Sequence, residues 1–152
     1  MTAVIAEERP DTADARMLIE ELEGHLECFY PSESRHGYSI DKLLRERVAF
    51  FVVREDGVPA GCGGVQIYGT DYGELKRMYV RPKFRRLGLG KLILSHLTDY
   101  ARQQGVSLLR LETGIYQKEA IGLYEAFGFQ RIPPFVPYVE DPLSLFFGKR
   151  IS

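Results

Sequence analysis

The chain has little of what secreted and membrane-spanning proteins are rich in. It contains two cysteines and no tryptophan in 152 residues, and two cysteines cannot form the disulfide framework of a small secreted domain. Its longest apolar run, residues 48–53, is far shorter than the roughly 20 residues that cross a bilayer as a helix. Residues 1–10 lack the basic start and apolar core of a signal peptide. We therefore expect a cytoplasmic protein with reduced thiols and no membrane segment.

An excess of charge of one sign is also missing. The chain has 20 lysines and arginines against 21 aspartates and glutamates, a formal net charge of −1. This balance provides no global field that would attract nucleic acid or an anionic membrane. The three histidines show no metal-ligand spacing, so we expect no metal. A hydrophobic content of 45% is typical of a globular protein, and the length fits one domain over residues 1–152.

Apolar periodicity predicts strands and helices in alternation. The expected strands are residues 2–6, 48–54, 58–68, 74–81, 106–113, 129–132 and 143–150. The expected helices are residues 12–29, 39–46, 87–104 and 117–127. A strand, a helix and a strand follow one another from residue 74 to residue 113, which predicts a crossover and one parallel pair. The pattern indicates an α+β fold with a mostly antiparallel sheet and helices on both sides.

The most informative stretch is residues 85–91, Arg-Arg-Leu-Gly-Leu-Gly-Lys, which follows a strand and opens a helix. Its two glycines allow a ligand to approach the backbone. The first helical turn leaves N–H groups unpaired, and the helix dipole adds partial positive charge, so this is an anion site. The helix dipole disfavours basic residues at this end. A bound anion would explain why they are there.

Two familiar glycine loops do not fit this stretch. A dinucleotide fingerprint needs Gly or Ala where Ile93 stands. A P-loop needs Gly at the position of Arg85 and Ser or Thr at that of Leu92. The pattern that fits is Arg/Gln-x-x-Gly-x-Gly/Ala, with Arg85, Gly88 and Gly90 at its defined positions. An ordinary basic, solvated helix start is the alternative.

This pattern resembles the pyrophosphate loop of the GNAT (GCN5-related) N-acetyltransferase superfamily. A second motif, Leu-Tyr-x-x-x-Gly-Phe at residues 123–129, lies at a family-like separation, and the resemblance covers about residues 48–129. It implies a GNAT-like fold whose central sheet of about six to seven strands, mostly antiparallel, contains a splayed parallel pair. It also implies acetyl-CoA as cosubstrate, and an acetyl group that passes directly to a primary amine in a ternary complex.

The resemblance implies which residues bind the cosubstrate. They are Met78, Tyr79, Val80, Arg85, Arg86, Leu87, Gly88, Leu89, Gly90 and Lys91. The first three are expected to hold the thioester and the pantetheine arm through their backbone groups, and the others to hold the pyrophosphate.

Acetyl transfer needs a group that accepts the proton of the amine and a group that protonates the departing thiolate. The resemblance implies Tyr124 as the acid, and a phenol is protonated at neutral pH; a core tyrosine is the alternative. The resemblance also implies Glu74 as the candidate base, although a carboxylate is a weak base unless burial raises its pKa. A strand glutamate paired with Lys76 or Arg110 is equally consistent with the sequence. Glu112 is the substitute base.

The acceptor pocket of such a fold would lie between residues 30–38 and 133–141, which both mix aromatic and charged side chains. Arg35 could hold a carboxylate, with Tyr38 and Tyr138 enclosing a small ligand. We therefore expect a small-molecule amine, such as an amino acid, as substrate. Acetylation of protein N-termini or lysines, and a non-catalytic acyl-CoA-binding domain, remain alternatives. A homodimer is left open.

Overall fold

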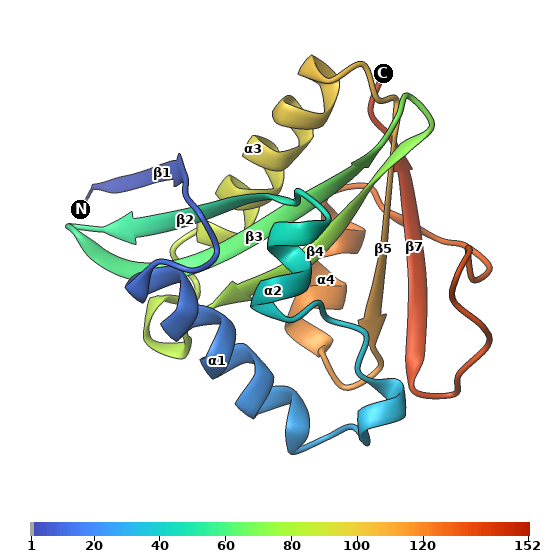
Figure 1. The fold of residues 1–152 in the computed structure, drawn as a ribbon, viewed down its shortest axis with the longest axis horizontal. Helices are drawn as coiled ribbons and strands as arrows, with labels where there is room; N and C mark the ends of the chain where they lie inside the picture. The colour runs from blue at the N-terminus through green and yellow to red at the C-terminus, as the bar shows by residue number, and fades with distance from the viewer. Residues whose placement is uncertain (1) are drawn as a thin grey trace.

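The computed structural model describes residues 2–152, which form one seven-stranded sheet with helices on both faces (Figure 1). The strands, in the spatial order β1-β2-β3-β4-β5-β7-β6, are β1 (Ala3–Glu7), β2 (Ala49–Glu55), β3 (Val58–Tyr68), β4 (Tyr72–Val80), β5 (Leu108–Gly114), β7 (Ser144–Arg150) and β6 (Gln130–Arg131). The helices are α1 (Ala13–Glu27), α2 (Ile40–Arg45), α3 (Leu89–Gln103) and α4 (Lys118–Ala126). The mixed α+β fold predicted from the sequence is confirmed.

The core has two parts because the sheet is covered on both faces. On one face, α3 and α4 pack through residues such as Ile93 of α3 and Tyr124 of α4. On the other, α1 and α2 pack through residues such as Leu18 and Leu43. Successive side chains of a strand point to opposite faces, so the apolar run at residues 48–53 contributes to both parts.

The pair β4–β5 is the only parallel pair among the described strands, and it is short. Its two registered positions are Gly73 opposite Leu109 and Glu74 opposite Arg110. Beyond them the strands diverge, as Figure 1 shows between the labels β4 and β5. After Glu74, the edge of β4 that faces β5 therefore has no strand partner, and its backbone groups need other hydrogen-bonding partners.

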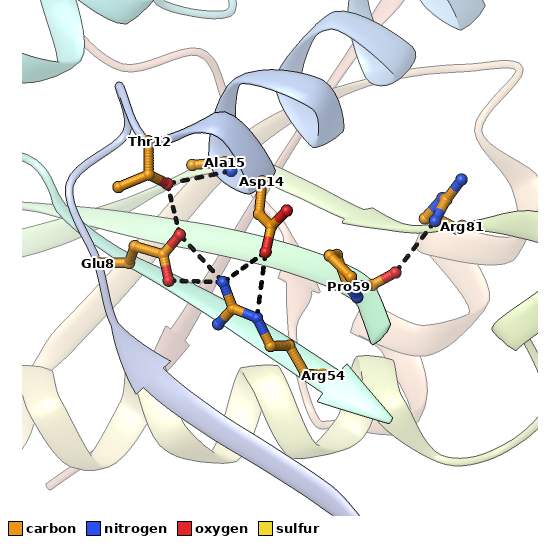
Figure 2. A network of polar contacts seen from close by, with 7 residues as sticks. All are labelled: Glu8, Thr12, Asp14, Ala15, Arg54, Pro59 and Arg81. Carbon is orange, nitrogen blue, oxygen red and sulfur yellow. Dashed lines mark hydrogen bonds and ion pairs between the residues drawn. The ribbon is translucent and has the colours of Figure 1, made fainter. Parts of the chain in front are cut away.

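A polar network fastens the start of α1 to the sheet (Figure 2). Arg54 of β2 donates to Glu8 and to Asp14, at 2.9 Å each. Thr12 caps α1 by accepting a hydrogen bond from the Ala15 backbone N–H at 3.2 Å. This network holds α1 in place at the end of the helix remote from the cavities described below.

No helix within residues 2–152 is long and apolar enough to cross a membrane. The strand expected at residues 129–132 is shorter than its apolar pattern suggested, because only Gln130 and Arg131 pair with β7.

Candidate active site

The divergence of β4 and β5 opens onto a cavity of about 500 Å³, called here the larger cavity. Its lining comes from α1, β4, the 85–91 loop, the start of α3, and α4. Nine of the ten residues predicted to bind the cosubstrate line it, and Leu87 does not. Leu87 is 42% exposed and lies outside the lining. Side chains far apart in the sequence thus meet where the resemblance implied acetyl-CoA.

The start of α3 presents uncapped backbone N–H groups at the larger cavity. Gly88 is the residue before the helix, with φ of 79°, and no side chain caps the helix. A Cβ at Gly88 would meet nothing within 4 Å, so this glycine faces open space in a conformation that other residues rarely adopt. The N–H groups of the first turn therefore stay available to a ligand.

Gly90 has a different role from Gly88. A Cβ at this position would lie 2.7 Å from Cδ2 of Leu123, a side chain of α4. Gly90 thus allows α3 to begin close against α4. Gly88 is thus needed for the backbone conformation of the loop, and Gly90 for close packing of α3 against α4. Together the two glycines position the loop at the larger cavity.

A smaller cavity of about 100 Å³ adjoins the larger one, and five residues line both. These shared residues are Leu22, Met78, Gln117, Ala120 and Tyr124. The smaller cavity is otherwise lined by residues of α1, the 34–37 segment, β4 and β5, with Arg35, His36, Lys76, Arg77 and Glu112 as its ionisable members.

Tyr124 lies on the wall that the two cavities share, and it is also a core residue. Its side chain packs against Phe129 and Phe147, with ring centroids 5.8 and 6.3 Å away. Burial, with a smaller contribution from the Glu112 carboxylate, raises the pKa of its phenol. The sequence left open whether Tyr124 is an acid or a core residue. These two roles are compatible, since the core fixes the ring beside both cavities.

Glu112 is the carboxylic acid of the smaller cavity. Burial raises the pKa of its carboxyl to about 7, against the opposing effects of a hydrogen bond from Ser144 and the charge of Lys76. Ser144 Oγ donates to Glu112 Oε2 at 2.8 Å. Because Glu112 also affects the pKa of Tyr124, the two groups are within electrostatic reach of each other.

Glu74 lines neither cavity and belongs to a buried network behind Lys76, a residue of the smaller cavity. It is 1% exposed, and its Oε2 is 2.9 Å from Lys76 Nζ. Tyr138 donates a hydrogen bond to the same carboxylate oxygen and accepts one from Lys76 at 2.8 Å. Glu74 thus has the Lys76 partner that the sequence left as the alternative to a catalytic role. Arg110, the other partner considered, lies over the rings of Tyr72 and Phe135 instead.

Of the three predicted acceptor residues, Arg35 lines the smaller cavity and the two tyrosines do not. Tyr38 donates to Gln66 at 2.7 Å, and Tyr138 belongs to the Glu74 network. The sequence reasoning missed Arg77 and His36 as cavity residues. Arg77 lies where the pairing of β3 and β4 shifts register, between Cys62 and Gly64. No local sequence pattern reveals such a shift.

The chain belongs to the acetyltransferase (GNAT) family, whose model matches residues 16–129. It is an acyltransferase of that class. Similar proteins include one named IAA acetyltransferase from Azospirillum brasilense, 43% identical over 95% of each chain. Another is the uncharacterized N-acetyltransferase YsnE of Bacillus subtilis, 34% identical over 93% of this chain and 97% of that one.

Solved structures agree with this assignment. A putative acyl-CoA N-acyltransferase from Klebsiella pneumoniae is 34% identical and superposes with a TM-score of 0.85, covering 99% of both chains. PaiA N-acetyltransferase from Thermoplasma acidophilum, solved in complex with coenzyme A, shares the fold with a TM-score of 0.76 at 21% identity, over 99% of both chains.

Proposed function

We propose that the protein transfers the acetyl group of acetyl-CoA to a primary amine of a small molecule, within a ternary complex. The observation that carries the proposal is the pair of adjoining cavities with Tyr124 on their shared wall. The larger cavity is assigned to acetyl-CoA and the smaller one to the acceptor amine. The volume of the smaller cavity, about 100 Å³, favours a small amine over a folded protein surface.

The larger cavity suits acetyl-CoA in charge and in shape. Arg85, Arg86 and Lys91 surround the free N–H groups at the start of α3, which favours the pyrophosphate there. The edge of β4 at residues 78–80 has no partner strand on its β5 side. The amide groups of the pantetheine arm can supply the missing hydrogen bonds, as an added strand would.

In the proposed mechanism, acetyl-CoA supplies the acetyl group as a thioester. Glu112 accepts a proton from the ammonium form of the substrate, and the neutral nitrogen then forms a bond with the carbonyl carbon. As the carbon–sulfur bond breaks, Tyr124 donates its proton to the departing sulfur, and the second proton that the nitrogen loses as the amide forms restores the phenol. The products are the N-acetylated amine and CoA. Glu74 remains a candidate base, but it would have to act through water and leave its ion pair with Lys76.

The test is an assay of CoA release from acetyl-CoA with a panel of amines, with mass spectrometry of the product. The panel should include amino acids, polyamines, peptides and IAA, since one relative carries that name. We expect turnover with a small amine and a mass increase of one acetyl group. Tight acetyl-CoA binding without turnover on any amine would instead establish a non-catalytic acyl-CoA-binding domain.

A further inference from the structure

Two arginines of the smaller cavity share one carboxylate. Glu23 of α1 accepts a hydrogen bond from Arg35 Nη1 at 2.8 Å, and its other oxygen lies 2.8 Å from Arg77 Nη1. Glu27 is 3.6 Å from the same Arg35 nitrogen, but its side chain is 60% exposed and is therefore screened by solvent. Two guanidinium groups thus face little more than one effective negative charge.

These arginines also carry unused hydrogen-bond donors. Arg77 and Glu23 form an ion pair, but the N–H groups of Arg77 Nη1 are not oriented for a hydrogen bond to the carboxylate. Within residues 2–152, the buried side-chain nitrogen and oxygen atoms without a partner are Arg35 Nε and Arg77 Nη1. A buried donor without a partner costs about 1–3 kcal/mol. Both such donors belong to one arginine pair that lines one cavity, and the chain's own groups leave this pair incompletely satisfied.

The backbone holds Arg77 in this place at a cost. The pairing of β3 and β4 shifts register between Cys62 and Gly64, and Arg77 has φ of 54° in this irregularity. A non-glycine residue with such a φ stores roughly 1–3 kcal/mol of strain. Its Nε donates to the Tyr38 carbonyl at 3.0 Å. The guanidinium also lies against Gly37, where a Cβ would come within 2.3 Å of Nη1. The guanidinium is therefore fixed before any ligand binds.

We propose that the acceptor amine carries a carboxylate, which binds to the paired guanidinium groups of Arg35 and Arg77. Planar guanidinium donors match the two oxygens of a carboxylate. The same cavity contains Glu112 and the ring of Tyr124, so one small molecule could present its amine to these groups and its carboxylate to the arginines. This inference rests on the proposed acetyl transfer and narrows its acceptor to the amino acid class.

Neighbouring groups leave the anion site to the two arginines. His36 lines the cavity, but burial lowers the pKa of its imidazole, which is therefore neutral at neutral pH. Lys76 is held by Glu74 and Tyr138. Replacing Arg35 therefore removes about half of the positive charge available to a carboxylate, while Arg77 and the strained strand remain in place.

The experiment compares the standard amino acids with their carboxamides, which keep the amine and lack the charge. For the best amino acid, we expect Arg35→Gln to raise KM about 10- to 100-fold with kcat little changed, the range for a lost charge-assisted hydrogen bond. For its carboxamide, KM should change less than about twofold. Arg35→Lys should restore part of the difference, because it keeps the charge and loses the planar geometry.

Arg54→Gln is the matched control. Arg54 also binds two carboxylates and has a similarly exposed side chain, 28% against 21% for Arg35, but it lines neither cavity (Figure 2). We expect Arg54→Gln to leave the preference for the amino acid over its carboxamide unchanged. A wild type without that preference, or equal effects of Arg35→Gln on both substrates, would overturn the proposal.

A second measurement separates this inference from the proposed function. Calorimetry of N-acetyl amino acids and of their carboxamides, titrated into the CoA-loaded protein, does not depend on turnover. We expect the carboxylates to bind at least tenfold more tightly, and Arg35→Gln to remove this difference. If no amine is acetylated, carboxylate-specific binding that depends on Arg35 still supports the anion site. Its absence overturns the site.

Discussion

At the scale of single residues, one physical cause suits Glu112 and Tyr124 to opposite roles. Burial disfavours the charged form of both groups, because a charge loses hydration when it leaves water. For Glu112 this raises the pKa to about 7, which makes the carboxylate a better base near neutral pH. For Tyr124 it raises the pKa of the phenol, which stays protonated and able to donate. Burial therefore strengthens the proposed base and keeps the proposed acid neutral.

Replacement of Glu112 should change both the rate and its dependence on pH. For the wild type, we expect kcat/KM to rise with pH and to level off above an apparent pKa of about 7, as Glu112 loses its proton. Glu112→Gln should lower kcat about 10²- to 10⁴-fold and abolish this rise. The measurement is a pH–rate profile between pH 5 and about 9.

Glu74→Gln provides the discriminating comparison. Because Glu74 is held by Lys76 and Tyr138, its replacement should affect stability more than the pH profile. If Glu74→Gln removed the rise with pH and Glu112→Gln did not, the base would be Glu74, as the resemblance first implied.

Tyr124→Phe should lower kcat about ten- to a thousandfold, while the affinity for acetyl-CoA stays nearly the same. The ring packs against Phe129 and Phe147 in either case, so the change removes the proton donor and little of the packing. Single-turnover kinetics and calorimetry measure the two quantities. An unchanged rate of the chemical step would leave Tyr124 as a core residue only.

At the scale of elements, the parts of the site that are local in the sequence could be predicted from it. The glycine loop and the start of α3 lie within residues 85–91, so their spacing carries the information. The apolar run of β2 and the stripes of α1 and α3 likewise predicted elements of the right type. Their ends differ by a few residues, because local hydrogen bonding determines where an element stops.

Apart from Arg35 and Glu112, the residues around the smaller cavity could not be predicted, because their positions depend on contacts between distant segments. Glu74 was correctly placed on a strand, but its partner Tyr138 is 64 residues away. Arg77 enters the cavity through a register shift between β3 and β4, which depends on how two strands pair. The preference for Glu112 over Glu74 follows from their surroundings: Glu112 lines the smaller cavity, whereas Glu74 is paired with Lys76 and Tyr138. The residue type alone does not determine this difference.

Replacement of Gly88 tests the element that is assigned to the pyrophosphate. Gly88→Glu should abolish acetyl-CoA binding, because it places a side chain and a negative charge at the free N–H groups of α3. Gly57→Glu is a matched control. Gly57 has φ of 82° against 79° for Gly88, and a Cβ at either position meets nothing within 4 Å.

Gly57 lies in the turn between β2 and β3 and lines neither cavity, so Gly57→Glu should bind acetyl-CoA normally. Calorimetry measures both affinities, and thermal unfolding verifies that both variants fold. Unchanged affinity in a folded Gly88→Glu variant would refute the assignment of the loop.

At the scale of the whole molecule, both cavities are assembled from segments that span most of the chain. Leu22 comes from α1, Met78 from β4, and Ala120 and Tyr124 from α4, and all four line both cavities. In Figure 1, α4 is seen between the diverging strands β4 and β5, and α1 lies at the lower left. A ligand in the larger cavity therefore contacts the first helix, the centre of the sheet and the last helix at once, and it should stabilise the fold as a unit.

Acetyl-CoA should therefore raise the unfolding temperature. At a concentration 100-fold above Kd, binding to the native state adds about 2.7 kcal/mol. For a chain of this size each kcal/mol shifts Tm by about 2–4 °C, so we expect a rise of about 5–10 °C. The Gly88→Glu variant should show no rise. Hydrogen exchange should slow in α1 near Leu22, in residues 78–91 and in α4, and stay unchanged in β1. Protection confined to residues 85–91 would mean that the ligand contacts the loop alone, and that the larger cavity is not its site.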